Sequence, residues 1–172
     1  MKKIDFRTDV LPLKNELFRL ALHITLDRAE AEDVVQETLI KVWNRREQWE
    51  QIESIEAFAL TVCRNMAIDR QRKAESRMTT LLEPSHDTPD SSWTANPEQQ
   101  AMHEDRLRLV RRLISQLPEK QRTCMQLREQ EGKSYKEIAQ VMGISEDQVK
   151  INIHRARQTL RQRYFETEKY GL

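Results

Sequence analysis

The sequence predicts an all-α protein of two small helical domains joined by a flexible acidic linker. Among its 172 residues are only three glycines and five prolines, and 33% of the residues are charged. Apolar residues recur at helical spacing on both sides of a stretch that contains Pro84, Pro89 and Pro97. The predicted boundaries are residues 1–77 for the first domain, 78–95 for the linker, and 96–172 for a second domain, a four-helix unit that ends in a helix-turn-helix.

The first two helices are predicted from apolar spacing and one capping residue. Leu13, Leu17, Leu20 and Ile24 predict a helix over residues 10–25. Asp27 is a typical residue to begin the next helix. That second helix has a core stripe of Ala31, Val35, Leu39 and Val42.

A different face of the second helix has the composition of a protein-binding patch. An apolar centre with a polar rim is typical of such patches. A solvated face with one stray isoleucine is the alternative, and the residues alone leave it open. The face consists of Asp33, Gln36, Glu37, Ile40 and Asn44.

A third helix is predicted from Ile55 to about Arg77, with Ser54 as its cap. Between residues 64 and 77 it carries five basic residues and two acids, and a loop around Trp49 precedes it. An aromatic loop followed by a basic helix suits single-stranded nucleic acid, whose bases stack and whose phosphates need neutralising. A basic, solvated helix end is the alternative.

The linker has the opposite charge. Residues 78–105 contain no lysine or arginine and include six acids: Glu83, Asp87, Asp90, Glu98, Glu104 and Asp105. Such a segment could lie along a basic channel of a partner, in place of nucleic acid, or could act only as a solvating spacer.

Two helices are predicted before the helix-turn-helix. Leu107, Val110, Ile114 and Leu117 predict the buried face of one, which Pro118 ends. A second runs from Glu119 to about Gln130, and Gly132 stops it.

The segment from Ser134 to Arg163 predicts two helices joined by a tight turn. Ser134 with Glu137, and Ser145 with Gln148, have the capping-box pattern that begins a helix. Gly143 between them can take the left-handed conformation that ends one. The predicted core stripe of the second helix is Val149, Ile153, Ala156 and Leu160.

The side of that helix opposite its core stripe favours duplex DNA. From Gln148 to Arg163 there are five lysines or arginines and no acid, so the surface should attract phosphates. Ile151 lies among them, where it could pack on a thymine methyl in a major groove. A helical hairpin with an ordinary solvated face is the alternative. The exposed residues are Asp147, Ile151, His154, Arg155 and Gln158, flanked by Lys150, Arg157 and Arg161.

Several classes of protein are not favoured. No apolar run is long enough to cross a membrane, and MKKIDFRTDV lacks the apolar core of a signal peptide, so we expect a cytoplasmic protein with no membrane insertion. Cys63 and Cys124 stand far apart without a CxxC motif, which predicts buried thiols and no metal site or disulfide. No P-loop, nucleophile elbow or HExxH motif is present, so we expect no cofactor and no enzymatic activity.

Three segments together resemble the extracytoplasmic-function (ECF) sigma factors of the sigma-70 family. They are DRAEAEDVVQETLIKVW at 27–43, TVCRNMAIDRQR at 61–72, and LPEKQRTCMQLREQEGKSYKEIAQVMGISEDQVKINIHRARQTLR at 117–161. The resemblance covers nearly the whole chain. It implies two helical domains, sigma region 2 and sigma region 4, and a linker that threads toward the active-site and RNA-exit channel of RNA polymerase.

The resemblance also implies roles for individual residues. The surface that docks on core RNA polymerase would contain Asp33, Gln36, Glu37, Ile40 and Asn44. The melted −10 element would be held by Trp49, Ser54, Arg64, Asn65, Asp69 and Arg70. The −35 duplex would be read by Ser145, Asp147, Lys150, Ile151, His154, Arg155 and Gln158.

Two departures from the family pattern affect what is expected. Leu26 stands where many relatives have glycine, which implies a different backbone geometry in that turn. Ile151 and Asn152 replace a common Ser-Arg pair in the recognition helix, so the usual −35 preference is not expected.

The function expected from these observations is that of a sigma factor. It binds core RNA polymerase and directs promoter-specific initiation, with bacterial polymerase, promoter DNA and an anti-sigma factor as partners. A stand-alone helix-turn-helix regulator would bind duplex DNA without polymerase and would leave the face around Ile40 unexplained. A helical adaptor that binds only proteins would show no salt-dependent affinity for nucleic acid.

Overall fold

The computed structural model describes residues 3–78 and 97–170, and all regular structure within them is helical. The predicted all-α class is therefore confirmed, whereas the predicted linker lies outside the described residues, Met78 excepted. In chain order the elements are a π-helical turn at Phe6–Val10, a 3-10 turn at Leu11–Leu13, α1 (Lys14–Thr25), α2 (Arg28–Asn44), a 3-10 helix at Arg46–Gln51, α3 (Ile55–Met78), α4 (Pro97–Ser115), α5 (Glu119–Glu129), α6 (Tyr135–Met142) and α7 (Glu146–Tyr170).

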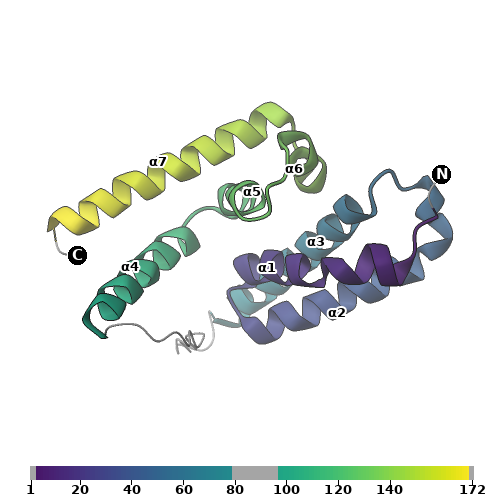
Figure 1. Cartoon of the computed structure of the whole chain (residues 1–172), viewed down its shortest axis with the longest axis horizontal. Coiled ribbons are helices and arrows are strands. Elements are labelled where there is room, and N and C mark those ends of the chain that lie inside the picture. Colours follow the sequence, from purple (N-terminus) through teal and green to yellow (C-terminus); the bar gives the residue numbers. More distant parts are fainter. Residues whose placement is uncertain (1–2, 79–96, 171–172) are drawn as a thin grey trace.

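Helices α1, α2 and α3 pack on one another as an N-terminal bundle (Figure 1). The predicted caps are confirmed. The Oδ1 of Asp27 accepts a hydrogen bond from the backbone N–H of Glu30 at 3.1 Å, and the Oγ of Ser54 accepts one from the N–H of Ala57 at 3.2 Å. These bonds satisfy donors that a helix start would otherwise leave unpaired.

The turn between α1 and α2 does not have the different geometry that its leucine implied. Leu26 itself takes the left-handed conformation, with φ 56° and ψ 22°, and its N–H donates to the carbonyl of Leu22 at 2.9 Å. This is the conformation that glycine usually supplies at a helix end. Leu26, which is 55% exposed, therefore keeps the turn and bears the steric cost of its side chain.

Helices α4 to α7 form a C-terminal unit, and its helix-turn-helix is as predicted. Ser134 and Glu137 form a complete capping box at the start of α6. At the start of α7, the Oγ of Ser145 accepts from the N–H of Gln148 at 3.1 Å, and the Gln148 side chain accepts from the N–H of Ser145 at 3.0 Å. Gly143 between the two helices has φ +67°.

The predicted buried face of α4 is partly wrong. Leu117, just beyond the helix, is buried and Ile114 is half-buried, but Leu107 is 40% exposed and Val110 is 36% exposed. Helix α4 packs mainly against the C-terminal half of α7, where Val110 and Leu113 meet Leu160, Arg161, Tyr164 and Phe165. Helix α7 does not fully cover the part of this apolar face that holds Leu107 and Val110.

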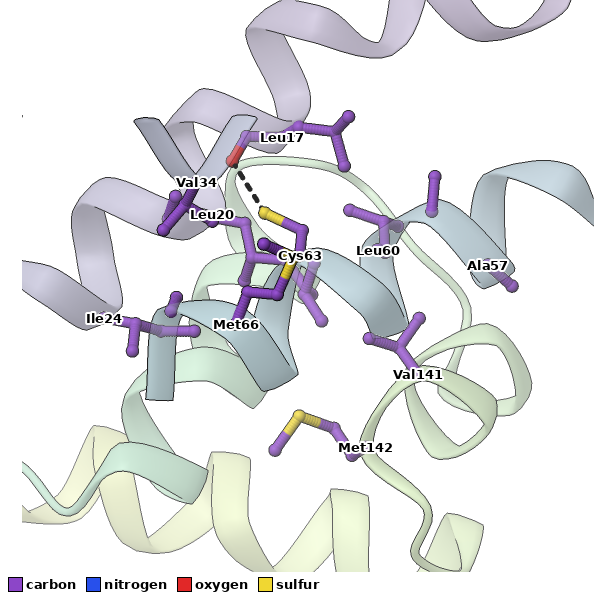
Figure 2. Close-up of a cluster of buried hydrophobic side chains, with 14 of the residues drawn as sticks. Leu17, Leu20, Ile24, Val34, Ala57, Leu60, Cys63, Met66, Val141 and Met142 are labelled. Atoms are coloured by element: carbon purple, nitrogen blue, oxygen red, sulfur yellow. Dashed lines mark hydrogen bonds between the residues drawn. The ribbon is translucent and has the colours of Figure 1, made fainter. Parts of the chain in front are cut away.

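The C-terminal unit packs on the N-terminal bundle through α5 and α6, which lie between α7 and the bundle (Figure 1). Helix α5 contacts α1, and α6 contacts α3. Figure 2 shows Val141 and Met142 of α6 facing Leu60, Cys63 and Met66 of α3. The two units thus share one apolar cluster in this closed arrangement. Within residues 3–78 and 97–170, no helix combines the length and the apolar character needed to span a bilayer.

Replacing Leu26 by glycine should raise the free energy of unfolding by about 0.5–1 kcal/mol, because glycine adopts this φ without a steric penalty. Urea unfolding followed by circular dichroism measures the change. The matched control is Leu26→Ala, which removes the exposed side chain but keeps a Cβ, and should bring no gain. Equal stabilities for the two variants would show that the turn is unstrained.

Candidate functional site

The face predicted to bind polymerase is present on α2. Its five residues, Asp33, Gln36, Glu37, Ile40 and Asn44, are all exposed, and Ile40 is 58% exposed. The opposite side of the helix is buried in the bundle through Ala31, Val34, Val35, Thr38 and Val42. The isoleucine is thus left in solvent among polar groups, while the core is complete without it.

Arg70 of α3 is bound to the acidic part of this face. Its guanidinium Nη1 lies 2.8 Å from a carboxylate oxygen of Glu30 and 3.5 Å from one of Asp33. Its Nη2 forms an ion pair with Glu37. The hydrogen bond to Glu30 and the charges of all three acids raise the pKa of Arg70. One residue predicted to bind −10 DNA therefore contacts two residues predicted to bind polymerase.

The face predicted to read the −35 duplex is also exposed. Its members Ser145, Asp147, Lys150, Ile151, His154, Arg155 and Gln158 are all exposed, Ile151 by 47%. Val149, Ile153 and Ala156, on the other side of α7, are buried. The capped start of α7 and the basic side chains beyond it are suited to phosphate and base contacts.

One basic residue next to this face was not predicted. Lys120 of α5 lines the same surface pocket as Ile144, Gln148, Ile151, Asn152 and Arg155. Lys120 is exposed at the start of α5, so it adds a positive charge beside the reading face from another helix. Only the packing of α5 against α7 brings it there, and no spacing in the sequence indicates that packing.

The residues predicted to hold the −10 element do not form one exposed surface. Trp49 is only 7% exposed, and its Nε1–H donates to the carbonyl of Val42 at 3.0 Å. Ser54 caps α3, whereas Asn65 and Asp69 are exposed on that helix. Trp49 and Ser54 thus have structural roles in this arrangement.

Trp43 is an exposed aromatic near Trp49. The residue is 44% exposed, and the guanidinium carbon of Arg46 lies 4.7 Å from its ring centroid. Phe6 and Trp49 meet the same ring edge to face, with centroids 5.2 and 6.2 Å away. The sequence feature that could have indicated Trp43 is the run VWNRR at residues 42–46, where the aromatic residue lies shortly before two arginines.

Arg64 lies where α3 meets the C-terminal unit. Its Nε and Nη2 donate to the two carboxylate oxygens of Glu119 at 3.1 and 3.0 Å, and the side chains are only 11% and 20% exposed. Two-point pairs between arginine and a carboxylate are among the stronger polar contacts in proteins. In the closed arrangement, this predicted DNA contact is occupied by an acid of the same chain.

Further polar contacts surround the apolar contact between the two units. The Nε of Arg19 lies 2.5 Å from a carboxylate oxygen of Glu131. Lys133 pairs with Glu16 at 2.9 Å and also with Glu56. The Nε2 of His23 lies 3.1 Å from the Oε1 of Gln130. Burial is the main cause that lowers the pKa of His23. The C-terminal unit contributes both signs of charge to this interface.

Both cysteines are buried free thiols, as predicted. Burial raises the pKa of Cys63 to about 12 and that of Cys124 to about 11. The Sγ of Cys63 donates to the carbonyl of Leu17 at 3.4 Å, and Cys124 lies near enough to Glu119 and Arg64 for both charges to act on its thiol. Cys124 therefore reports on the Arg64–Glu119 contact, whereas Cys63 lies in the apolar cluster that the two units share.

Comparisons with known proteins place both halves of the chain in one family. The family model for sigma-70 region 2 matches residues 10–77, and that for sigma-70 region 4 matches residues 107–160. The ECF RNA polymerase sigma factor SigL of Mycobacterium tuberculosis is 37% identical over 146 residues, which cover 84% of this chain and 80% of SigL. The ECF sigma factor SigX of Bacillus subtilis is 29% identical over 148 residues, covering 85% and 76%.

Solved structures have the same fold. The sigma factor RpoE of Bartonella quintana, in a complex with the anti-sigma factor NepR, aligns with a TM-score of 0.73 at 23% identity, covering 92% of this chain and 95% of that one. CnrH, in a complex with the cytosolic domain of CnrY, aligns with a TM-score of 0.67 at 19% identity, covering 94% and 88%.

Glu119→Gln should loosen the closed arrangement, because it removes the charge that pairs with the half-buried Arg64. For a pair that is mostly shielded from solvent we expect a cost of roughly 1–2 kcal/mol. Alkylation of Cys124 at pH 8, followed by mass spectrometry, should then become about tenfold faster, since the thiol reacts only when exposed.

The matched control is Glu129→Gln, which breaks the solvent-exposed pair with Arg157 inside the C-terminal unit. Glu129→Gln should leave the alkylation rate of Cys124 unchanged. Urea unfolding followed by circular dichroism tests whether the Glu119→Gln variant unfolds as a whole. If the gain in Cys124 reactivity were no larger than the gain in the globally unfolded fraction, the local role given to Glu119 would be wrong.

Proposed function

The chain belongs to the extracytoplasmic-function sigma factors of the sigma-70 family, and we propose that it uses the α2 face, the predicted −10 residues and the α7 face for the contacts of that activity. As a sigma factor it binds core RNA polymerase and directs promoter-specific initiation, and it is not an enzyme. The family match over residues 10–77 disfavours a stand-alone helix-turn-helix regulator. We propose which residues make each of these contacts. We also propose that the protein acts in the cytoplasm.

The observation that carries the proposal is that two polar faces, each with an exposed isoleucine at its centre, lie on opposite units of the chain. Ile40 on α2 is 58% exposed and Ile151 on α7 is 47% exposed, although both helices bury a full apolar stripe elsewhere. Exposed apolar side chains ringed by polar groups are typical of recognition surfaces. We assign the α2 face to core polymerase and the α7 face to the −35 duplex.

The division into domains follows this assignment. Residues 1–77 would form the unit that binds polymerase and the melted −10 element, through Trp49, Ser54, Arg64, Asn65, Asp69 and Arg70. Residues 96–172 would form the unit that binds the −35 element, and residues 78–95 would link the two. Contact between Arg64 and DNA would require Glu119 to release it, so −10 binding is expected only after the two units separate.

An anti-sigma factor is also proposed as a partner. The support is that two structures with this fold are complexes with the anti-sigma factor NepR and with the cytosolic domain of CnrY. A protein that bound across α1, α3, α5 and α6 would stabilise the closed arrangement by mass action.

The test of this assignment is run-off transcription on a promoter pool, with bacterial core polymerase alone and with core plus this protein. Start sites that depend on the protein would define the −35 and −10 elements together. Binding to core without new start sites, on promoters taken from the same host, would refute the assigned DNA contacts.

Two matched substitutions test the roles assigned to the α2 face and the α7 face independently. Ile40→Ser should weaken binding to core polymerase by about 2 kcal/mol, or roughly 30-fold, because it removes the apolar centre of the docking face. Ile151→Ser should keep that affinity and alter the −35 preference, by about 1 kcal/mol at one base pair. Fluorescence titration of core and transcription from −35 variants measure the two effects. The assignment would be overturned if Ile151→Ser lost affinity for core polymerase, or if Ile40→Ser kept its full affinity.

Arg155→Ala should relax specificity at one −35 position by about 1–3 kcal/mol if the guanidinium reads a base edge. The control is Arg157→Ala, whose guanidinium Nε already donates to Glu129 at 2.9 Å within the unit. Transcription from a set of single-base −35 variants distinguishes the roles. A uniform loss on all sequences in Arg155→Ala would reassign this residue to a phosphate.

A further inference from the structure

Arg70 connects α3 to three acids of α2. Its ion pairs with Glu30, Asp33 and Glu37 reach acids that lie on successive turns of one side of that helix. Like charges three and four residues apart on a helix repel each other. A guanidinium offers five N–H donors in a rigid fork, so one arginine can hold several carboxylates at once.

The exposure of these side chains shows which of them a partner can reach. The Arg70 side chain is 24% exposed, whereas those of Glu30, Asp33 and Glu37 are 42%, 63% and 49% exposed. A phosphate approaching Arg70 would meet these carboxylates and be repelled. A basic group approaching the acids would find free lone pairs, because each carboxylate accepts more than one hydrogen bond.

We infer that Arg70 is a positioning residue for polymerase docking: it holds Asp33 and Glu37 in place beside Ile40, for a basic partner surface with an apolar spot. This inference rests on the proposed function of the α2 face and competes with the −10 contact that family resemblance implies for Arg70. Pre-ordered acids lose less conformational freedom when the partner binds, which is the source of the gain in affinity.

The experiment compares Arg70→Ala, Arg70→Lys and the control Arg72→Ala in the full chain. Arg72 is an exposed arginine two residues along the same helix. Arg70→Ala should weaken binding to core polymerase by about 3- to 10-fold, Arg70→Lys should recover part of this through its charge, and Arg72→Ala should have little effect. At saturating core, the −10 preference of Arg70→Ala should equal that of the unmodified protein.

A double-mutant cycle separates positioning from a general loss of stability. If Arg70 acts through Glu37, then Arg70→Ala should cost much less in a Glu37→Gln background than alone. Additive losses would mean that Arg70 only supports the fold, which overturns the inference. Unchanged or tighter core binding in Arg70→Ala would overturn it as well, as would a loss of −10 preference at unchanged core affinity.

Ile40→Ser distinguishes failure of this inference from failure of the proposed function. If Ile40→Ser weakens core binding and Arg70→Ala does not, then the docking face is right and only the role of Arg70 is wrong. If neither variant weakens core binding, the α2 face is not the docking surface and both proposals fall together.

Discussion

The burial of α5 and α6 against α1 and α3 is the contact on which the closed arrangement depends. Val141 and Met142 complete a cluster that begins inside the N-terminal bundle with Leu60 and Cys63 (Figure 2). Small helical units bury a modest fraction of their apolar surface when alone, so a shared core stabilises both. The arrangement covers Arg64 on α3 and leaves the faces of α2 and α7 that carry Ile40 and Ile151 in solvent.

The polar contacts around this cluster determine how it responds to its surroundings. The pairs Arg19–Glu131 and Lys133–Glu56 each include one side chain with substantial exposure, and salt screens pairs of this kind. The apolar contact is not screened, because it depends on the area removed from water. Raising the ionic strength alone therefore loosens the rim and leaves the centre in place. A partner that opens the two units has to replace apolar contacts as well as charges.

Local features of the fold could be predicted from the sequence, because their causes lie within a few residues. The capping boxes at Ser134 and Ser145, the left-handed Gly143 and the buried stripe of α7 each follow from spacing of four residues or fewer. Predictions that needed a neighbouring helix were less successful. Apolar periodicity predicted that the face of α4 that includes Leu107 is buried, but could not show that α4 packs mainly against the distal half of α7.

The predicted and proposed site residues divide in the same way. The faces around Ile40 and Ile151 were predictable, because a residue at helical spacing away from the core stripe has to face solvent. The excess of basic residues on α3 was a weaker indication of DNA contacts, because a count of charges does not show which acids lie nearby in the fold. Arg64 pairs with Glu119, which lies 55 residues away in the sequence, and Arg70 pairs with Glu30, which lies 40 residues away. An arginine that suits a phosphate suits a carboxylate equally well. At least two of the five basic residues that indicated single-stranded DNA, Arg64 and Arg70, are thus paired with acids within the described residues. Whether either binds DNA depends on what competes with those carboxylates when polymerase is bound.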